Sequence, residues 1–226
     1  MDIILIGGLW LPPSVWDAVL PGLRDAGHNP IVVALPGQGD GRTDATLDDQ
    51  VDAVLAAVDS AGAPALVVGH SAAATLAWLA ADRRPDRVAK VVFIGGMPTA
   101  HGELYAPWFE ADGDAIPFVG WEAFEGPDSA DLTEAQKADV TASAQPVPVG
   151  VAQGIVRYER ADRHATPTVE VCPEFSPDDV RAWLASSDAP ELAAIQNLEL
   201  VDIDSGHWPM VSAPDELARV LAELAD

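Results

Sequence analysis

The sequence predicts an α/β protein built on a doubly wound, mostly parallel sheet of six strands. Two observations predict this fold. Short apolar runs alternate with helix-like segments along the chain, and such alternation is typical of a parallel sheet covered by helices on both faces. Two of these runs also end in loops that carry Ser71 and His207. We expect the strands at residues 3–6, 31–34, 65–68, 90–94, 168–172 and 198–203.

The spacing of apolar residues predicts the helices between these strands. Residues 51–58 and residues 217–224 place apolar side chains three and four positions apart, which puts them on one face of a helix. A hydroxyl residue followed three positions later by an acid marks a helix start. This signal occurs at Thr46 with Asp49 and at Ser212 with Asp215.

Residues 69–73 (GHSAA) are the most informative stretch. They follow the apolar run 65–68 and precede the helix-like run 74–79. A serine in a tight strand-to-helix turn with small neighbours is a nucleophile elbow, in which strained backbone lifts the hydroxyl above the strand end. The pattern departs from G-x-S-x-G only at Ala73, the smallest step up from glycine. A tight turn with a capping serine is the alternative interpretation of this stretch taken alone.

His207 favours the catalytic interpretation. It lies in the loop after the run 198–203, just before a helix that begins near Pro214. A histidine in a loop after a late strand can reach the elbow serine as its general base, and the chain has the serine first and the histidine last. We expect His70 to turn its side chain away from the site and to have a structural role.

These features resemble the α/β-hydrolase superfamily over nearly the whole chain. Residues 3–10 (IILIGGLW) look like that family's first parallel strand and oxyanion loop, with Gly7 in place of histidine. Trp16 stands where the family often has a tryptophan, and residues 34–41 (ALPGQGDG) resemble its D-x-P-G-x-G-x-S turn. The family's usual first two strands are missing. The resemblance therefore implies a trimmed α/β-hydrolase fold, that of a small hydrolase of unassigned substrate.

Residues 97–166 interrupt the alternation and hold half of the chain's Phe, Trp and Tyr residues. The resembling family places its cap after the fourth strand. The resemblance thus implies one α/β-hydrolase domain at 1–226, with a cap or lid insertion at 97–166 that gives the substrate pocket apolar walls. The alternative is that these aromatic residues only pack the cap on the core. For the pocket we expect Trp10, Trp108, Trp121 and Trp208.

Composition limits the class of protein. A chain of 226 residues that is 49% hydrophobic can bury a large core as one domain. No apolar run reaches the roughly 18 residues needed to span a bilayer, and the first residues lack the basic region of a signal peptide. The chain has one cysteine, Cys172, so no disulfide can form within it. We therefore expect a cytoplasmic protein.

The charge is strongly acidic, with 36 acidic and 12 basic residues and a net charge of −24. Such a surface repels nucleic acid and anionic lipid, so the expected partner is a small-molecule substrate and neither nucleic acid nor a membrane. The histidines outside the motifs, His28, His101 and His164, have no paired ligand spacing, and we expect no metal. The glycine-rich turn 37–41 lacks a phosphate-binding lysine, and we expect no cofactor.

The catalytic chemistry needs four parts. The Ser71 hydroxyl needs a base to take its proton, and His207 can do so and return the proton to the leaving group. The oxyanion needs preorganised N–H donors, which we assign to the backbone of Ala72 and Leu9. The imidazole also needs an acid on its second nitrogen.

The acid is the least defined part. The resembling family usually places aspartate just after the strand at 168–172, where alignment finds Ser176. Ser176 with Asp179 reads as a helix start, which leaves Glu174 as the acid of the strand-to-helix loop. Glu103 is the runner-up, because some relatives take their acid from the loop after the fourth strand. Asp204, close to His207, is as consistent with a turn.

The sequence thus predicts a serine hydrolase that uses a serine–histidine–acid triad on a small, largely apolar ester or related acyl compound. Two alternatives stay open. A lyase or a C–C bond-cleaving enzyme can use the same fold and triad, and a non-catalytic ligand-binding module can keep the fold. The sequence does not determine the oligomeric state.

Overall fold

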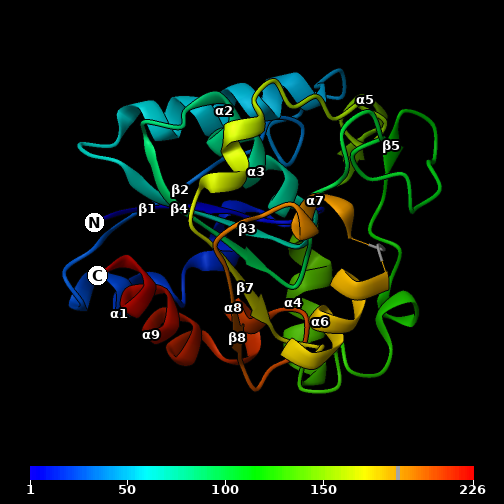
Figure 1. Cartoon of the computed structure of the whole chain (residues 1–226). Coiled ribbons are helices and arrows are strands. Elements are labelled where there is room, and N and C mark those ends of the chain that lie inside the picture. The colour runs from blue at the N-terminus through cyan, green and yellow to red at the C-terminus, as the bar shows by residue number, and fades with distance from the viewer. Residues whose placement is uncertain (187–188) are drawn as a thin grey trace.

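The computed structural model describes residues 1–186 and 189–226. Its main sheet has six strands in the order β2-β1-β3-β4-β7-β8, and every neighbouring pair is parallel (Figure 1). The strands are β1 (Asp2–Ile6), β2 (Asn29–Val32), β3 (Ala65–His70), β4 (Val88–Ile94), β7 (Thr168–Cys172) and β8 (Leu198–Asp202). The predicted fold class is therefore confirmed.

The second strand begins earlier than predicted. β2 starts at Asn29 and includes Pro30, whereas the sequence placed the start after the proline. Proline has no N–H to give to a ladder, but β2 is an edge strand and pairs only with β1. An edge strand tolerates proline because one of its sides needs no partner.

Helices cover both faces of the sheet. Figure 1 places α2 and α3 on one face and α1 and α9 on the other. The pleat divides each strand between two cores, so that Ile4 packs toward α2 and α3 whereas Leu5 packs toward α1 and α9. These helices are α1 (Leu20–Asp25), α2 (Leu47–Ser60), α3 (Ala74–Arg83) and α9 (Pro214–Ala225). Among the described residues, no helix is both long and apolar enough to cross a membrane.

The two predicted helix starts have different outcomes. Thr46 and Asp49 form a complete capping box at the start of α2, as predicted. The prediction for Ser212 and Asp215 is wrong, because α9 begins at Pro214 without a side-chain cap. Proline at a first helical position has no N–H to cap. Ser212 instead ends the short helix α8 (Pro209–Ser212).

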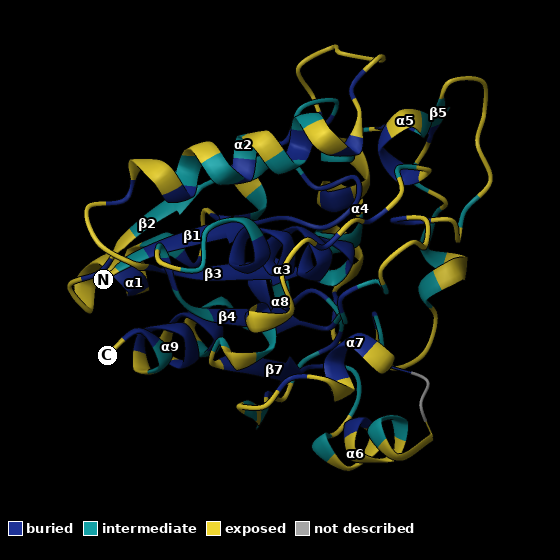
Figure 2. Ribbon diagram, turned by 45° about the horizontal axis from the view of Figure 1, so that its top comes forward, coloured by how far each residue is buried: buried dark blue, intermediate teal, exposed yellow. Residues whose placement is uncertain are grey.

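A long connection, residues 95–167, joins the adjacent strands β4 and β7. It contains a small antiparallel sheet that the sequence did not predict, because each of its strands is too short to show a period. Figure 2 shows mostly exposed residues in the loop beside β5, in contrast to the buried main sheet. The connection holds β5 (Ala115–Ile116), η3 (Trp121–Phe124), α4 (Glu134–Ser143), β6 (Val147–Pro148), α5 (Val149–Ala152) and η4 (Ala161–Ala165).

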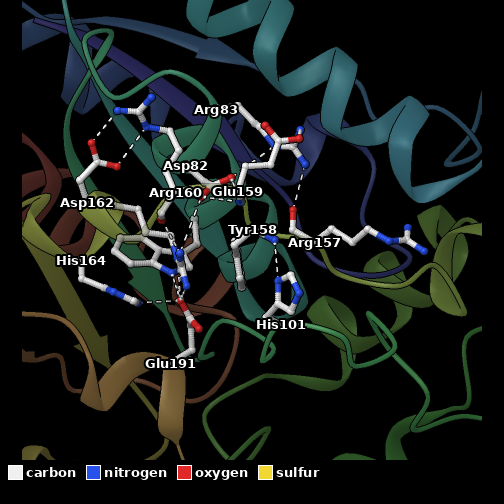
Figure 3. A network of polar contacts seen from close by, with 12 residues as sticks. Asp82, Arg83, His101, Arg157, Tyr158, Glu159, Arg160, Asp162, His164 and Glu191 are labelled. Atoms are coloured by element: carbon white, nitrogen blue, oxygen red, sulfur yellow. Dashed lines mark hydrogen bonds and ion pairs between the residues drawn. The ribbon is translucent and has the colours of Figure 1, made fainter.

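The end of the connection is tied to α3 by a polar network (Figure 3). The buried Asp82 carboxylate accepts backbone N–H groups from residues 159 and 160. Glu191 accepts the Trp78 indole N–H and two N–H groups of Arg163. Glu191 lies on α7 (Pro190–Ala193), which follows α6 (Pro177–Ser186). The network therefore fixes the path by which the connection returns to β7.

Candidate active site

Ser71 lies directly after β3, in a backbone conformation that is rare for a residue with a side chain. Its φ is 54°, inside the left-handed region. The turn is so tight that a Cβ on Gly69 would lie 2.2 Å from the carbonyl oxygen of Ala73. Only glycine fits at position 69, and Ala73 is fully buried without a clash. Residues 69–73 thus have the strained geometry expected of an elbow.

The structure brings Ser71, His207 and Glu174 together. The Ser71 Oγ lies 3.0 Å from His207 Nε2, and the other ring nitrogen, Nδ1, lies 2.5 Å from Glu174 Oε1. A carboxylate can only accept, so Nδ1 carries the proton and Nε2 is free to accept the serine proton. The three residues follow β3, β7 and β8, whose carboxyl ends meet at one edge of the parallel sheet.

Of the acids that the sequence offered, Glu174 is the one that lies beside His207. Ser176 and Asp179 cap each other at the start of α6, so the helix-start prediction is confirmed. Glu103 is exposed, and among the described residues its hydrogen bonds are backbone contacts. Asp204 is exposed as well. The second oxygen of Glu174, Oε2, is buried and has no hydrogen-bond partner among the described residues.

Two glycines after β4 make the room that this arrangement needs. Gly95 has a φ of 60°, and a Cβ there would lie 3.1 Å from Glu174 Oε2 and 3.2 Å from His207 Nδ1. A Cβ on Gly96 would lie 2.4 Å from the Ser71 carbonyl oxygen. Neither glycine was predicted from the sequence to belong to the site. The Gly-Gly pair at a strand end was the available signal, since such a pair permits close backbone approach.

His70 lies beside the site, and the expectation that it turns away is wrong. Its ring centroid is 4.9 Å from that of His207. Its Nε2 donates to the backbone carbonyl of His207 at 2.7 Å, because a carbonyl can only accept. Burial, with the charge of a protonated His207 as a second cause, lowers the pKa of His70 to about 3. His70 is therefore a neutral ring that supports the loop of His207.

An apolar cavity of about 190 Å³ lies beside Ser71 and His207. Three of the four predicted pocket residues, Trp10, Trp108 and Trp208, line it. Trp121 stands behind the wall, because its indole N–H bonds to α4 and its ring packs against Trp208. The sequence did not single out Phe109, Phe118 and Phe124, which also line the cavity. The high content of aromatic residues in 97–166 was the sequence feature that could have indicated these three wall residues.

The loop after β1 is braced from several sides. Leu9 lines the cavity, and the next residue, Trp10, has a φ of 66°, a strained value for a residue with a side chain. The Gln38 amide donates to the carbonyls of Gly8 and Leu11. The Trp10 indole donates to the carbonyl of Ile116 in the connection. This bracing would hold backbone N–H groups in fixed positions, and the assignment of Leu9 and Ala72 to an oxyanion hole stays a prediction.

Known proteins resemble this chain in sequence and in fold. Putative methylesterase 12, chloroplastic, of Arabidopsis thaliana is 24% identical over an alignment of 255 positions that covers 98% of this chain and 71% of that protein. Pimeloyl-[acyl-carrier protein] methyl ester esterase of Aromatoleum aromaticum is 36% identical over an alignment of 111 positions that covers 47% of this chain and 43% of that protein. An extracellular alpha/beta-hydrolase from a Paenibacillus species has a TM-score of 0.82 at 16% identity, covering 100% of this chain and 99% of that one.

The family follows from a match along the chain. A family model described as "Alpha/beta hydrolase family" matches residues 3–220. This range contains the elbow, the loop of Glu174 and His207. The chain therefore belongs to the alpha/beta hydrolase family. It is an enzyme of the carboxylic ester hydrolase type.

Proposed function

We propose that this enzyme hydrolyses small, largely apolar carboxylic esters with Ser71 as nucleophile, His207 as base and Glu174 as acid. The observation that carries the proposal is the continuous pair of hydrogen bonds from Ser71 through His207 to Glu174. It lies at an apolar cavity. A nucleophile held by a base that is itself oriented by a carboxylate is the arrangement that acyl transfer needs.

In the first half of the reaction, Ser71 Oγ attacks the ester carbonyl carbon while its proton moves to His207 Nε2. Glu174 stabilises the imidazolium through Nδ1–H, and the backbone N–H groups of Leu9 and Ala72 stabilise the oxyanion. The C–O bond to the alcohol then breaks as Nε2 returns the proton to the alcohol oxygen. In the second half, His207 Nε2 takes a proton from a water molecule, which attacks the acyl-serine carbonyl carbon. The bond to Ser71 Oγ then breaks, Nε2 returns the proton to Oγ, and the carboxylic acid leaves.

The cavity supports a small, neutral substrate. Its volume, about 190 Å³, is below the roughly 300–1,000 Å³ that is usual for drug-sized ligands. Six aromatic rings line it, from Trp10, Trp108, Phe109, Phe118, Phe124 and Trp208. The net charge of −24 disfavours polyanionic substrates. Because two relatives are named as a putative methylesterase and a methyl ester esterase, methyl esters belong in any substrate panel.

The connection between β4 and β7 supports a cap role for residues 97–166, since Trp108, Phe109, Phe118 and Phe124 come from it. We include in the proposal one domain at 1–226 with this segment as its cap. The expected partner is a small-molecule substrate. The cytoplasmic location stays a prediction.

The test is Ser71→Ala beside Ser60→Ala, an exposed serine at the end of α2. We expect a panel of neutral esters of increasing acyl length, including methyl esters, to be hydrolysed by the wild type and by Ser60→Ala. Ser71→Ala should lose turnover by about 10⁴-fold or more, because no other group can form the acyl-enzyme. A fluorophosphonate should label Ser71 in the wild type.

Other outcomes would decide between the alternatives. Turnover without a covalent adduct on Ser71 would indicate a lyase in which serine and histidine only move protons. Ligand binding without any turnover, unaffected by Ser71→Ala, would indicate a binding module. Labelling of a different serine would refute the assigned nucleophile.

A further inference from the structure

The backbone on either side of the His207 ring is held at three points. The His207 N–H donates to the carbonyl of Asp128 at 2.8 Å. The preceding N–H, of Gly206, donates to the Asp131 carboxylate at 2.7 Å. The His207 carbonyl accepts from His70 at 2.7 Å. Two of these three contacts come from the connection between β4 and β7, and they fix the direction in which the imidazole leaves the chain.

The contact with Asp131 is close on both of its oxygens. Oδ2 accepts the Gly206 N–H, whereas a Cβ on Gly206 would lie 2.4 Å from Oδ1. The same Cβ would lie 2.4 Å from the carbonyl oxygen of Asp128. Gly206 is buried although Asp131 is exposed. The segment 128–131 therefore packs directly on the loop of His207, with no space for a side chain at position 206.

Phe124, which lies just before this segment, forms part of the cavity wall. The Phe124 ring lies nearly parallel to the His207 ring, with centroids 6.5 Å apart and an interplanar angle of 14°. The buried Ser129 hydroxyl donates to the Phe124 carbonyl at 2.7 Å. Farther along, the Gln136 amide donates to the Val211 carbonyl, beyond His207 in the chain. Residues 124–136 therefore contact both the ring and the backbone of the base.

We infer that Asp131 is a positioning residue for His207: its carboxylate holds the Gly206 N–H so that the imidazole meets Ser71 and Glu174 together. This inference rests on the proposed function. The ring must satisfy two hydrogen bonds at once, 3.0 Å to Ser71 and 2.5 Å to Glu174. A misplacement of about 1 Å can cost about 100-fold in rate, so an anchor on the backbone matters for turnover although it touches no reacting atom.

The experiment compares Asp131→Ala, Asp131→Asn and Asp139→Ala. Asp139 is an exposed acid on α4 with no hydrogen bond to the His207 loop among the described contacts, and it serves as the matched control for lost charge. For each variant we would measure kcat, KM, the rate of fluorophosphonate labelling at Ser71 and the thermal melt. Labelling reports how well His207 activates the serine, and it needs no knowledge of the natural ester.

We expect Asp131→Ala to lower both kcat and the labelling rate by about ten- to a hundredfold, with KM changed little. Asp131→Asn should recover most of both rates, because its amide oxygen can still accept the Gly206 N–H. Asp139→Ala should match the wild type. Gly206→Ala is a second route to the same defect, since its Cβ would push the loop away from Asp128 and Asp131.

Three outcomes would overturn the inference. Wild-type rates in Asp131→Ala would do so, and so would a lower melting temperature with unchanged labelling of the folded enzyme, which is the signature of a merely structural role. Asp131→Asn as slow as Asp131→Ala would also contradict it. A wild-type chain that is not labelled at Ser71 would overturn the proposed function itself and the inference with it, and this result is distinct from the other three.

Discussion

Glu174 and Glu191 each accept a hydrogen bond from a histidine, but their remaining partners differ. Glu174 Oε1 lies 2.5 Å from His207 Nδ1, and Oε2 has no partner among the described residues. Glu191 Oε1 accepts from His164 at 3.0 Å, and it also accepts from Trp78 and from two N–H groups of Arg163. Both carboxylates are largely shielded from solvent.

On the proposed function, the difference between the two pairs explains why only Glu174 would support catalysis. The Glu191 charge is already balanced by the Arg163 guanidinium, so a proton on His164 adds little. No arginine or lysine in the described part of the chain pairs with Glu174, and a proton arriving on His207 is the charge that it could balance. The far nitrogen of His207 also meets a hydroxyl, that of Ser71. Glu174 is therefore suited to stabilise a His207 that is protonated and deprotonated during the proposed reaction. Glu191 is suited to a permanent ion pair that stabilises the fold.

The largest expected effect is that of Glu174→Gln on turnover. The substitution keeps the shape but removes the charge, and its amide N–H can face Nδ1 and favour the wrong tautomer of His207. We expect kcat to fall by about 10³–10⁴-fold with KM changed little. Steady-state kinetics beside a thermal melt would measure this.

Glu103→Gln is the matched control, since Glu103 is exposed and its hydrogen bonds among the described residues are backbone contacts. It should behave as the wild type. If Glu103→Gln were the crippled variant, the acid would come from the loop after β4. If both variants kept their turnover, His207 would be oriented by another group.

The sequence could predict the parts of the site that depend on strand ends. Ser71 and His207 follow strands of one parallel sheet, so their meeting is a consequence of topology. Glu174 could be selected because Ser176 and Asp179 cap a helix, which is a local property. The six strands were predictable for the same reason, since each contains a short run rich in apolar residues.

The remaining features depend on contacts between distant loops. Asp131 and Gly206 lie 75 positions apart, and nothing in the local sequence pairs them. Whether the His70 ring faces the site depends on the path of the His207 loop, and that path is set by tertiary packing. Trp121 was expected in the pocket because it is aromatic. Its indole N–H instead donates to groups on α4, and these hydrogen bonds hold the ring behind the cavity wall.

The second prediction tests the structural carboxylate with the same substitution. Glu191→Gln leaves the Arg163 guanidinium buried without its main counter-charge, and breaking such a pair destabilises a fold strongly. We expect a loss of about 3 kcal/mol in the free energy of unfolding, or roughly 6–12 °C in melting temperature. Turnover of the folded variant should equal that of the wild type. A large fall in kcat would contradict the contrast between the two glutamates.

The pH dependence sharpens this prediction. Burial raises the pKa of Glu191, but the hydrogen bonds from Trp78, Arg163 and His164 and the charge of Arg163 together outweigh burial, so the pKa lies below its ordinary value of 4.5. An acid with a lowered pKa stabilises the fold above its ordinary value and loses this contribution as the pH falls through the lowered pKa. The difference in melting temperature between wild type and Glu191→Gln should therefore be full at neutral pH and shrink in acid below 4.5.

A third buried glutamate has the opposite behaviour, and its effect should be the smallest. Glu170 on β7 is fully buried, and neither oxygen has a hydrogen-bond partner of normal geometry among the described residues. Burial raises its pKa well above the ordinary value of 4.5, and the nearby Gly96 N–H offsets this only in part. Glu170 is therefore protonated in the fold under conditions in which the unfolded chain ionises it.

The sign of its effect on stability follows from this proton. Above 4.5 the native chain holds one more proton at Glu170 than the unfolded chain does, so this group lowers stability as the pH rises. Glu170→Met, which has similar volume and no charge, should raise the free energy of unfolding by about 1–2 kcal/mol at neutral pH. The pH-dependent part of this gain should disappear as the pH falls to 4.5, where the unfolded chain also holds the proton. Melts of both proteins across this range would measure it. A gain that is constant with pH, or a variant that is less stable at every pH, would show that Glu170 is held by a partner and belongs with Glu191.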